Sequence, residues 1–297
     1  MSVERNGSRT AGNDKTVIFL HIGKTAGTTL RKILQRQFRS SQVMLVRARM
    51  RPREETLADF AGLPESQRSR PRLILGHTVF GLHEYVPRPC TYVTVLRNPT
   101  SLVLSQYQFV LRTTDHRHHQ VVTAEKMSLE DYIESGVSVE MNNSQTRAIS
   151  GDLDTPYGQC RPEMLERAKE NLEVHFSVAG LTERFDETLI MLMKAFDWSR
   201  LYYVPTNVSP DSGRREPPTD RTMDLIRELN QLDFDLYRYV GDRFEETIRR
   251  HPTFQQDLAR FRKVNALYRP FGSVRRVVPQ LLYGKLKQRV GSARSAP

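Results

Sequence analysis

A strand, a short loop and a helix near the start of the chain constrain the fold more than any other segment. Residues 17–30 read Val-Ile-Phe-Leu-His-Ile-Gly-Lys-Thr-Ala-Gly-Thr-Thr-Leu. The apolar, β-branched run at 17–22 predicts a buried strand of a parallel sheet. Beyond the loop, apolar residues return at the spacing of one helical face, at Leu30, Ile33, Leu34 and Phe38. The segment therefore predicts an α/β fold in which a buried strand leads directly into a helix.

The loop has the composition of an anion-binding site. The first N–H groups of a helix have no partner within the helix, and the helix dipole adds positive charge there. Glycines let the backbone approach a ligand closely, a lysine supplies a point charge and threonines supply hydroxyl donors. The loop residues are Gly23, Lys24, Thr25, Ala26, Gly27, Thr28 and Thr29. We expect them to hold a phosphate or a group shaped like one; a turn without a ligand is the alternative.

The order of residues separates this loop from the nucleotide-triphosphate loop, Gly-x4-Gly-Lys-Ser/Thr. Lys24 directly follows the first glycine, and Thr28 stands after Gly27, where that loop has lysine. The order instead resembles the 5′-phosphosulfate loop of sulfotransferases that use 3′-phosphoadenosine 5′-phosphosulfate (PAPS), above all the branch of the heparan sulfate 2-O-sulfotransferases and their bacterial relatives. The resemblance implies a P-loop-like three-layer fold, with a central parallel sheet and helices on both faces. It also implies PAPS as co-substrate, with no metal required.

A second strand end supports the first motif. The apolar run at 91–96 predicts another buried strand, followed by Arg97 and by Pro99, which is suited to start a helix. Open α/β sheets bind ligands at the carboxyl ends of their strands. An arginine fork and a hydroxyl together suit a phosphate. The resemblance implies that Arg97 and Ser105 bind the 3′-phosphate of PAPS; a structural ion pair is the alternative for Arg97.

A histidine is the candidate general base. His77 follows the short apolar run at 72–76, and histidine suits proton transfer because its pKa lies near neutrality. The segment resembles the stretch of the heparan sulfate 2-O-sulfotransferases that carries His-Gly-His. His77 matches its second histidine, whereas Leu75 stands at the first. A structural role for His77 is the alternative, and His83 or Glu84 are other candidates for the base.

The remaining histidines favour structural interpretations. His21 is expected to shape the anion-binding loop. His116, His118 and His119 alternate with an arginine in a polar segment, so we expect a solvated loop rather than a metal site.

Later stretches also resemble the family, so that the resemblance spans roughly residues 16–245. The Asn-x-x-Thr-Arg pattern at 142–151 resembles a segment near the cofactor and acceptor, and leaves Arg147 as either a ligand contact or an ion-pair partner. Asn207 begins a stretch where the family's chain returns toward the nucleotide. Arg214 and Arg215 follow in a polar loop, and either contact a cofactor phosphate or remain solvated.

The chain of 297 residues is long enough for one α/β domain, which we place at residues 16–265 after a disordered N-terminus at 1–15. Helices are expected between the strands, for example at 162–173 and 182–196. The expected strands lie near 17–22, 43–46, 72–76, 91–96, 175–180 and 200–204.

The net charge of +11 is unevenly distributed. Residues 266–297 carry seven basic side chains and no acidic one, with apolar residues interleaved at helical spacing. They predict a basic amphipathic tail that contacts a membrane surface, packs on the body or is disordered. Residues 31–53 carry eight basic side chains and no acidic one, and either line an anionic cleft or form a solvated face. No nucleic-acid motif accompanies the charge.

Cys90 and Cys160 are the only cysteines, which argues against a disulfide framework and favours a reducing compartment. The sequence has neither a run of about 20 apolar residues nor an apolar signal segment near its start. Animal members of the family carry an N-terminal membrane anchor. We therefore expect a cytoplasmic protein, either free or peripheral on the inner membrane surface, or a trimmed form.

Together these features predict a transferase that moves a sulfuryl group from PAPS to a hydroxyl on a sugar of a glycan or glycolipid. His77 would take the acceptor proton during an in-line displacement, and Lys24 would stabilise the developing charge. A non-catalytic descendant that binds glycans, and an ATP-dependent P-loop kinase or hydrolase, are the alternatives. The sequence does not specify the acceptor.

Overall fold

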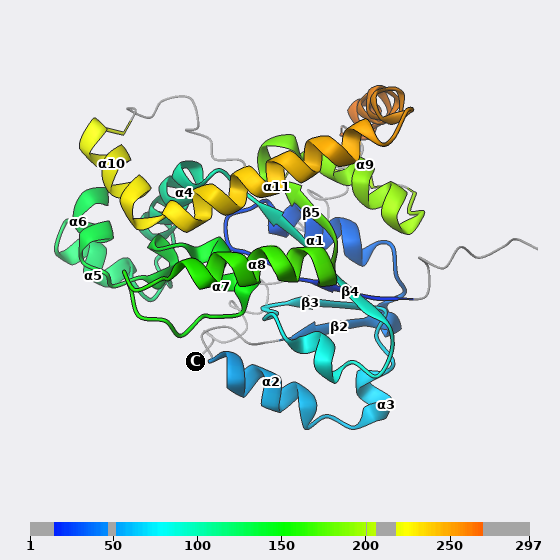
Figure 1. Cartoon of the computed structure of the whole chain (residues 1–297), viewed down its shortest axis with the longest axis horizontal. Coiled ribbons are helices and arrows are strands. Elements are labelled where there is room, and N and C mark those ends of the chain that lie inside the picture. Colours follow the sequence, from blue (N-terminus) through cyan, green and yellow to red (C-terminus); the bar gives the residue numbers. More distant parts are fainter. Residues whose placement is uncertain (1–14, 47–51, 200, 206–217, 270–297) are drawn as a thin grey trace, which may run out of the picture.

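The computed structural model describes residues 15–46, 52–199, 201–205 and 218–269. Its centre is a five-stranded parallel sheet in the order β2-β3-β1-β4-β5 (Figure 1). The strands are β1 Thr16–Phe19, β2 Val43–Val46, β3 Leu73–Gly76, β4 Cys90–Leu96 and β5 Phe176–Leu181. Because all five strands run the same way, the loops at their carboxyl ends meet at one edge of the sheet.

Burial of the central strands explains why this sheet forms. Every residue of β1 is buried, and so are the apolar residues of β3 and all of β4 after its first residue. A strand whose side chains are buried on both faces needs cover on both faces. The β-branched and leucine-rich runs seen in the sequence supply that apolar surface.

Helices provide the cover. The α-helices are α1 Gly27–Gln35, α2 Arg53–Ala61, α3 Glu65–Arg68, α4 Pro99–Arg112, α5 His119–Ala124, α6 Leu129–Glu134, α7 Ser144–Ser150, α8 Pro162–His175, α9 Phe185–Phe196, α10 Asp220–Leu229 and α11 Gln231–Arg249. Short 3-10 turns are η2 Ser40–Gln42, η3 Leu82–Tyr85, η4 Val139–Met141 and η5 Thr182–Arg184. The crossover through α1 moves toward β2, and the one through α8 moves the opposite way, toward β5. Right-handed connections therefore place α1 and α8 on opposite faces.

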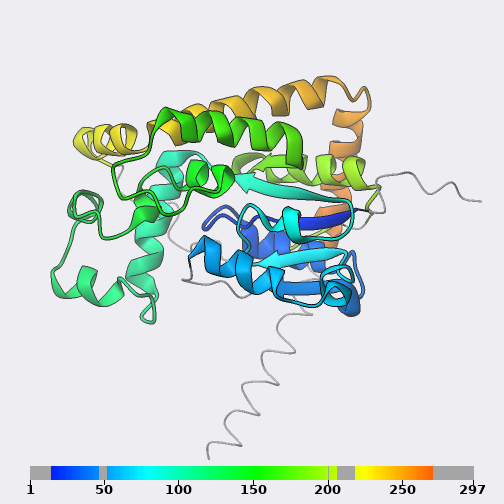
Figure 2. The ribbon, with the colours of Figure 1, turned by 60° about the horizontal axis from the view of Figure 1, so that its bottom comes forward.

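Two apolar clusters hold the fold together. The larger surrounds the sheet and includes residues from all five strands. The smaller joins α4, α5, α6 and α10 through buried side chains such as Val110, Tyr132 and Ile226. Figure 1 shows α5, α6 and α10 gathered at one end of the molecule, while Figures 1 and 2 both show α8 and α11 lying side by side.

The structure confirms the fold class and the first five expected strands, although β1 ends at Phe19 rather than at residue 22. The strand expected at 200–204 is wrong for its described part, because residues 201–205 form no strand. The backbone N–H of Tyr203 donates instead to the Asn265 side chain at 2.8 Å, in place of a strand partner.

The structure describes only the first residues of the expected C-terminal tail. Residues 254–269 are helical, so the boundary expected between 265 and 266 falls inside one helix. The rest of the tail, the N-terminal residues 1–14, Asn207, and the arginines at 214 and 215 lie outside the described residues. None of the described helices combines the length and apolar character needed to cross a bilayer. Cys90 and Cys160 are free thiols.

Candidate functional site

The loop between β1 and α1 has an unusual backbone. Lys24 and Ala26 have positive φ angles of 62° and 60°, which non-glycine residues rarely adopt, whereas Thr25 between them does not. A left-handed residue next to right-handed helical ones, as at Ala26 before α1, turns successive N–H groups toward one concavity, which suits an anion. Ala26 is also the N-cap of α1 and makes no side-chain hydrogen bond there. Strain of this kind persists only where the surroundings enforce it, and it gathers at functional sites.

His21 packs against the loop at Gly27. Its ring stacks on Phe19, with ring centres 5.4 Å apart, and lies directly against the α-carbon of Gly27. A β-carbon at Gly27 would come within 2.0 Å of the His21 ring. Position 27 therefore requires glycine because the His21 ring lies so close to its backbone, not because of its backbone φ angle. Burial, followed by the nearby His77, Arg31 and Lys24, lowers the pKa of His21 to about 4, so the ring is neutral.

Lys24 faces helix α4. Its Nζ lies 4.0 Å from the ring centre of Phe109, within cation–π range. Burial, followed by repulsion from Arg112 and Arg97, lowers the pKa of Lys24 to about 8. Ser105 precedes Phe109 by four residues and therefore lies on the same face of α4, the face toward the loop.

Arg97 joins the second strand end to the loop. Its Nη1 donates to the backbone oxygen of Lys24 at 3.0 Å. The side-chain amide of Gln145 holds the Arg97 backbone at both its N–H and its C=O, at 2.8 and 2.9 Å. Pro99 opens α4 as expected, with the Asn98 side chain accepting from Ser101 N–H at 3.2 Å. The two predicted anion-binding motifs thus lie together, while the roles of their residues remain predictions.

His77 lies at the carboxyl end of β3, beside the loop. Its side chain is exposed, its N–H donates to the Val46 oxygen at 3.0 Å, and the next residue, Thr78, is tied to the Phe19 oxygen at 2.6 Å. Gly76 before it has φ of 116°, and a β-carbon there would meet the Val46 oxygen at 2.3 Å.

Position 75 carries leucine rather than histidine, but another histidine lies near His77. Leu75 is fully buried in the core. His21, two residues beyond the end of β1, is close enough to His77 for that neighbour to contribute to the lowered pKa of His21. The sequence analysis expected His21 only to shape the loop and did not pair it with His77, because 56 positions separate them in the chain.

His83 and Glu84 lie elsewhere. The His83 ring is 4.2 Å from that of His175, which immediately precedes β5, so this pair lies at the amino end of the strands. Burial, followed by His175, lowers the pKa of His83. Its position beside the loop therefore favours His77 over His83 as the candidate general base.

The histidine tract is not the solvated loop expected. His118 is 8% exposed and accepts from Arg117 Nε at 2.7 Å, and burial lowers its pKa to about 4. His116 packs edge-on against Phe109, with ring centres 5.6 Å apart. Among the described residues, no group of three histidine, cysteine or acidic side chains is arranged to hold a metal ion.

Arg147 is structural. It is 2% exposed, and its guanidinium donates to the Asn142 oxygen at 2.8 Å, the Asn142 Oδ1 at 2.9 Å, the Pro156 oxygen at 3.0 Å and the Thr155 oxygen at 2.5 Å. These four hydrogen bonds occupy most of the guanidinium donors within the protein, so the structure favours internal partners over a ligand contact. The partners are neutral oxygens rather than the carboxylate of the expected ion pair.

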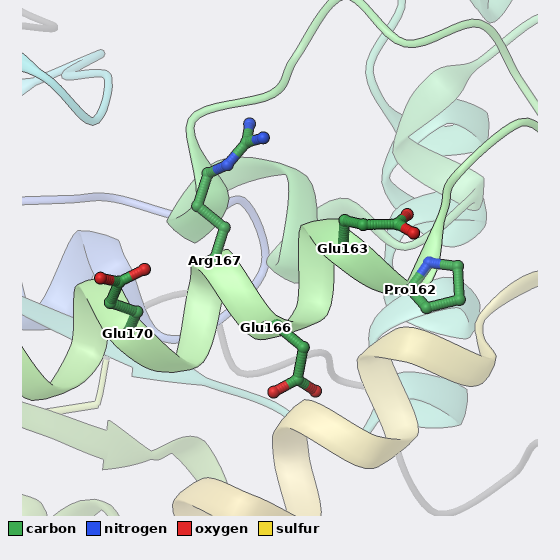
Figure 3. Close-up of a pocket in the computed structure, with 5 residues that line it drawn as sticks. All are labelled: Pro162, Glu163, Glu166, Arg167 and Glu170. Carbon is green, nitrogen blue, oxygen red and sulfur yellow. The ribbon is translucent and has the colours of Figure 1, made fainter.

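A separate depression of about 580 Å³ lies along the start of α8. Figure 3 shows its side chains fanning out from one helix without converging. Its lining residues are Pro162, Glu163, Glu166, Arg167 and Glu170. Three carboxylates repel an anion, so this surface does not compete with the loop as a site for one.

Comparisons with known proteins agree with these features. Residues 4–265 match the family described as galactose-3-O-sulfotransferase. Human heparan-sulfate 6-O-sulfotransferase 1 is 26% identical over 281 residues, which cover 78% of this chain and 66% of the human protein. Human galactose-3-O-sulfotransferase 3 is 27% identical over 250 residues, 80% of this chain and 57% of that protein. Mouse uronyl 2-sulfotransferase is 22% identical over 173 residues, 52% and 42% of the two chains. The chain thus spans about two thirds or less of these three proteins.

The contact between His21 and Gly27 generates a prediction. Gly27→Ala should lower the free energy of unfolding by about 1–3 kcal/mol, because the new methyl group overpacks against the His21 ring. In a His21→Ala background the same change should have a much smaller effect, since the obstacle is gone. Urea unfolding of the four proteins measures this coupling. Gly23→Ala is the control, because a β-carbon there meets nothing within 4 Å. Equal effects of Gly27→Ala in both backgrounds would contradict the prediction.

Proposed function

Because this chain belongs to the galactose-3-O-sulfotransferase family, we propose that it transfers a sulfuryl group from PAPS to a hydroxyl group of a sugar. The observation that carries the proposal is the contact between the guanidinium of Arg97 and the backbone of Lys24. It brings a strained anion-binding loop and a strand-end arginine to one place. PAPS presents two anionic groups, a 5′-phosphosulfate and a 3′-phosphate, and the site offers a cationic residue for each.

The residues of the site fit the two ends of this donor. The loop Gly23–Thr29, with Lys24, Thr25, Ala26, Gly27, Thr28 and Thr29, would bind the 5′-phosphosulfate through its N–H groups, the Lys24 ammonium and the hydroxyls of Thr28 and Thr29. The Thr25 hydroxyl is buried and donates to the Ile22 oxygen at 2.9 Å, so Thr25 would contribute its backbone rather than its hydroxyl. Arg97 and Ser105 would bind the 3′-phosphate, with Arg97 as a fork and Ser105 from the loop-facing side of α4. With both of its anionic groups bound, PAPS would be held in one position and orientation relative to His77.

Transfer would proceed by a single in-line displacement. The acceptor oxygen forms a bond to sulfur while the bond from sulfur to the 5′-phosphate oxygen breaks, and His77 takes the proton of the acceptor hydroxyl. Lys24 and the loop N–H groups stabilise charge on the departing phosphate. His77 is exposed at the strand end, so an acceptor can reach it.

The family supports a carbohydrate as the class of acceptor. The relatives' names refer to heparan sulfate, uronyl groups and galactose, which supports a carbohydrate acceptor here. A glycolipid acceptor, peripheral membrane contact through residues 266–297 and a cytoplasmic location are further proposals. They rest on the basic, apolar pattern of that tail and on the cysteine content.

Titration calorimetry with adenosine 3′,5′-bisphosphate, without magnesium, tests the donor assignment. We expect micromolar binding that Arg97→Ala weakens at least tenfold, because a charge-assisted contact to phosphate is lost. Arg227→Ala is the matched control, since Arg227 is an exposed arginine paired with Asp224 on α10.

Three results decide the proposal. Transfer from labelled PAPS to a sugar by the same protein would complete the case. Binding of magnesium ATP in place of the bisphosphate would identify a triphosphate-dependent enzyme. Binding of neither nucleotide, with salt-sensitive binding of glycans, would identify a non-catalytic protein.

The pKa of Lys24 predicts a pH dependence. With a pKa of about 8, Lys24 is charged below that pH and loses its charge as the pH rises through it. Affinity for adenosine 3′,5′-bisphosphate should therefore fall above pH 8 in the wild type. Lys24→Arg should keep its affinity to higher pH, because arginine stays protonated. Calorimetry between pH 6.5 and 9.5, about 1.5 units on either side of that pKa, measures both curves. Parallel curves would show that another group titrates.

His77 provides an independent prediction. His77→Ala should lower turnover about 10²–10⁴-fold, the usual contribution of a general base. It should leave the dissociation constant of adenosine 3′,5′-bisphosphate unchanged, because the exposed ring makes no contribution to holding the donor. Single-turnover transfer and calorimetry on the same protein separate the two effects. A matching loss of nucleotide affinity would show that His77 binds the donor instead. His83→Ala is the control from the far end of the sheet.

A further inference from the structure

A buried glutamine clasps the backbone of the strand-end arginine. Gln145 is fully buried in α7. Its Oε1 accepts from the Arg97 N–H at 2.8 Å, and its Nε2 donates to the Arg97 C=O at 2.9 Å. One side-chain amide therefore satisfies both polar groups of a single backbone residue, as a neighbouring strand would do.

Arg97 needs such a partner because it lies just beyond the sheet. The last register pair between β4 and β5 joins Leu96 to Leu181. The Leu96 oxygen is then capped by the Thr182 hydroxyl at 2.9 Å. With the ladder ended, the Gln145 clasp fixes the direction in which the Arg97 side chain leaves the strand. The far end of that side chain reaches the Lys24 oxygen.

The clasp is itself anchored by α11. Asp233 is fully buried, and its carboxylate accepts from the N–H of Gln145 at 3.1 Å and from the N–H and hydroxyl of Thr146 at 2.7 and 2.8 Å. Its own N–H donates to the Asn143 side chain at 3.0 Å. Burial raises the pKa of Asp233, and the hydrogen bonds from Thr146 and Gln145 oppose that rise. A carboxylate at a helix start also complements the helix dipole.

We propose that Gln145 is a positioning residue for Arg97, and that the chain of contacts from Asp233 through Gln145 to Arg97 sets selectivity for a nucleotide that carries a 3′-phosphate. The inference rests on the proposed function, because it assigns Arg97 to that phosphate. The contact between α7 and α11 would therefore influence nucleotide binding, although Gln145 lies between Asp233 and Arg97.

The test compares two nucleotides. Gln145→Met keeps the length and volume of the side chain and removes both hydrogen bonds. The readout is the ratio of the dissociation constants of adenosine 5′-phosphate and adenosine 3′,5′-bisphosphate, measured by calorimetry. We expect this ratio to fall about tenfold, because loss of the clasp weakens only the contacts with the 3′-phosphate.

A matched control separates positioning from general destabilisation. Asn171→Leu also removes a buried amide that bonds to α7, since Asn171 Nδ2 donates to the Ile149 oxygen at 2.8 Å. It does not touch Arg97, so the ratio should stay at the wild-type value even if the melting temperature falls. An equal fall in the ratio for both variants would overturn the proposal, and so would an unchanged ratio in Gln145→Met.

Hydrogen exchange gives a readout that does not depend on the nucleotide. In the ligand-free proteins, a peptide containing Arg97 should exchange faster in Gln145→Met than in wild type or Asn171→Leu, because the Arg97 N–H loses its acceptor. Unchanged exchange would refute the clasp itself. A wild type without preference for the bisphosphate, together with faster exchange in the variant, would leave the clasp intact. That combination would overturn both the selectivity role and the proposed donor.

Discussion

The hydrogen bond from Arg97 to the Lys24 oxygen is the contact on which the site depends. It is available because β1 pairs with β4 in parallel, so that the residues following the two strands emerge side by side. Lys24 turns its carbonyl toward Arg97 while its own φ is left-handed. The strained loop and the strand-end arginine therefore stabilise each other's positions, and neither arrangement is explained by its own segment alone.

This arrangement concentrates positive charge. Burial, Arg112 and Arg97 all disfavour the charged form of Lys24, and the face of Phe109 offsets part of that repulsion. Without an anion, the loop holds a lysine that is easier to deprotonate than usual. An arriving phosphosulfate would reverse the balance, since it adds opposite charge in a partly desolvated place. The positive charges that repel one another in the free site would thus attract the anion in the occupied site.

Local patterns were sufficient for the fold and for placing the predicted site residues at one edge of the sheet, while their roles remain predictions. Apolar runs predicted β1, β3 and β4, and the residues after them identified the loop, His77 and Arg97, because parallel strands end at one edge. The proximity of His21 to His77 and the hydrogen bonds of Gln145 to Arg97 were not predicted. Residues brought together from 56 and 48 positions apart leave no periodicity in the sequence. The run at 200–204 has strand-like composition, but Asn265 supplies its hydrogen-bond partner, so tertiary context overrode propensity.

Strand order also gives the site a direction. β3 lies on one side of β1 and β4 on the other, so His77 and Arg97 flank the loop from opposite sides. If Arg97 and α4 hold the nucleotide, its bulk lies toward β4, and the sulfuryl group at the loop faces β3. An acceptor sugar must then approach from the β3 side, where the proposed base is exposed at the surface. Selectivity for the nucleotide would reside on the β4 side of the sheet and selectivity for the sugar on the β3 side. Substitutions on the β3 side could then change the acceptor while the PAPS site stays the same.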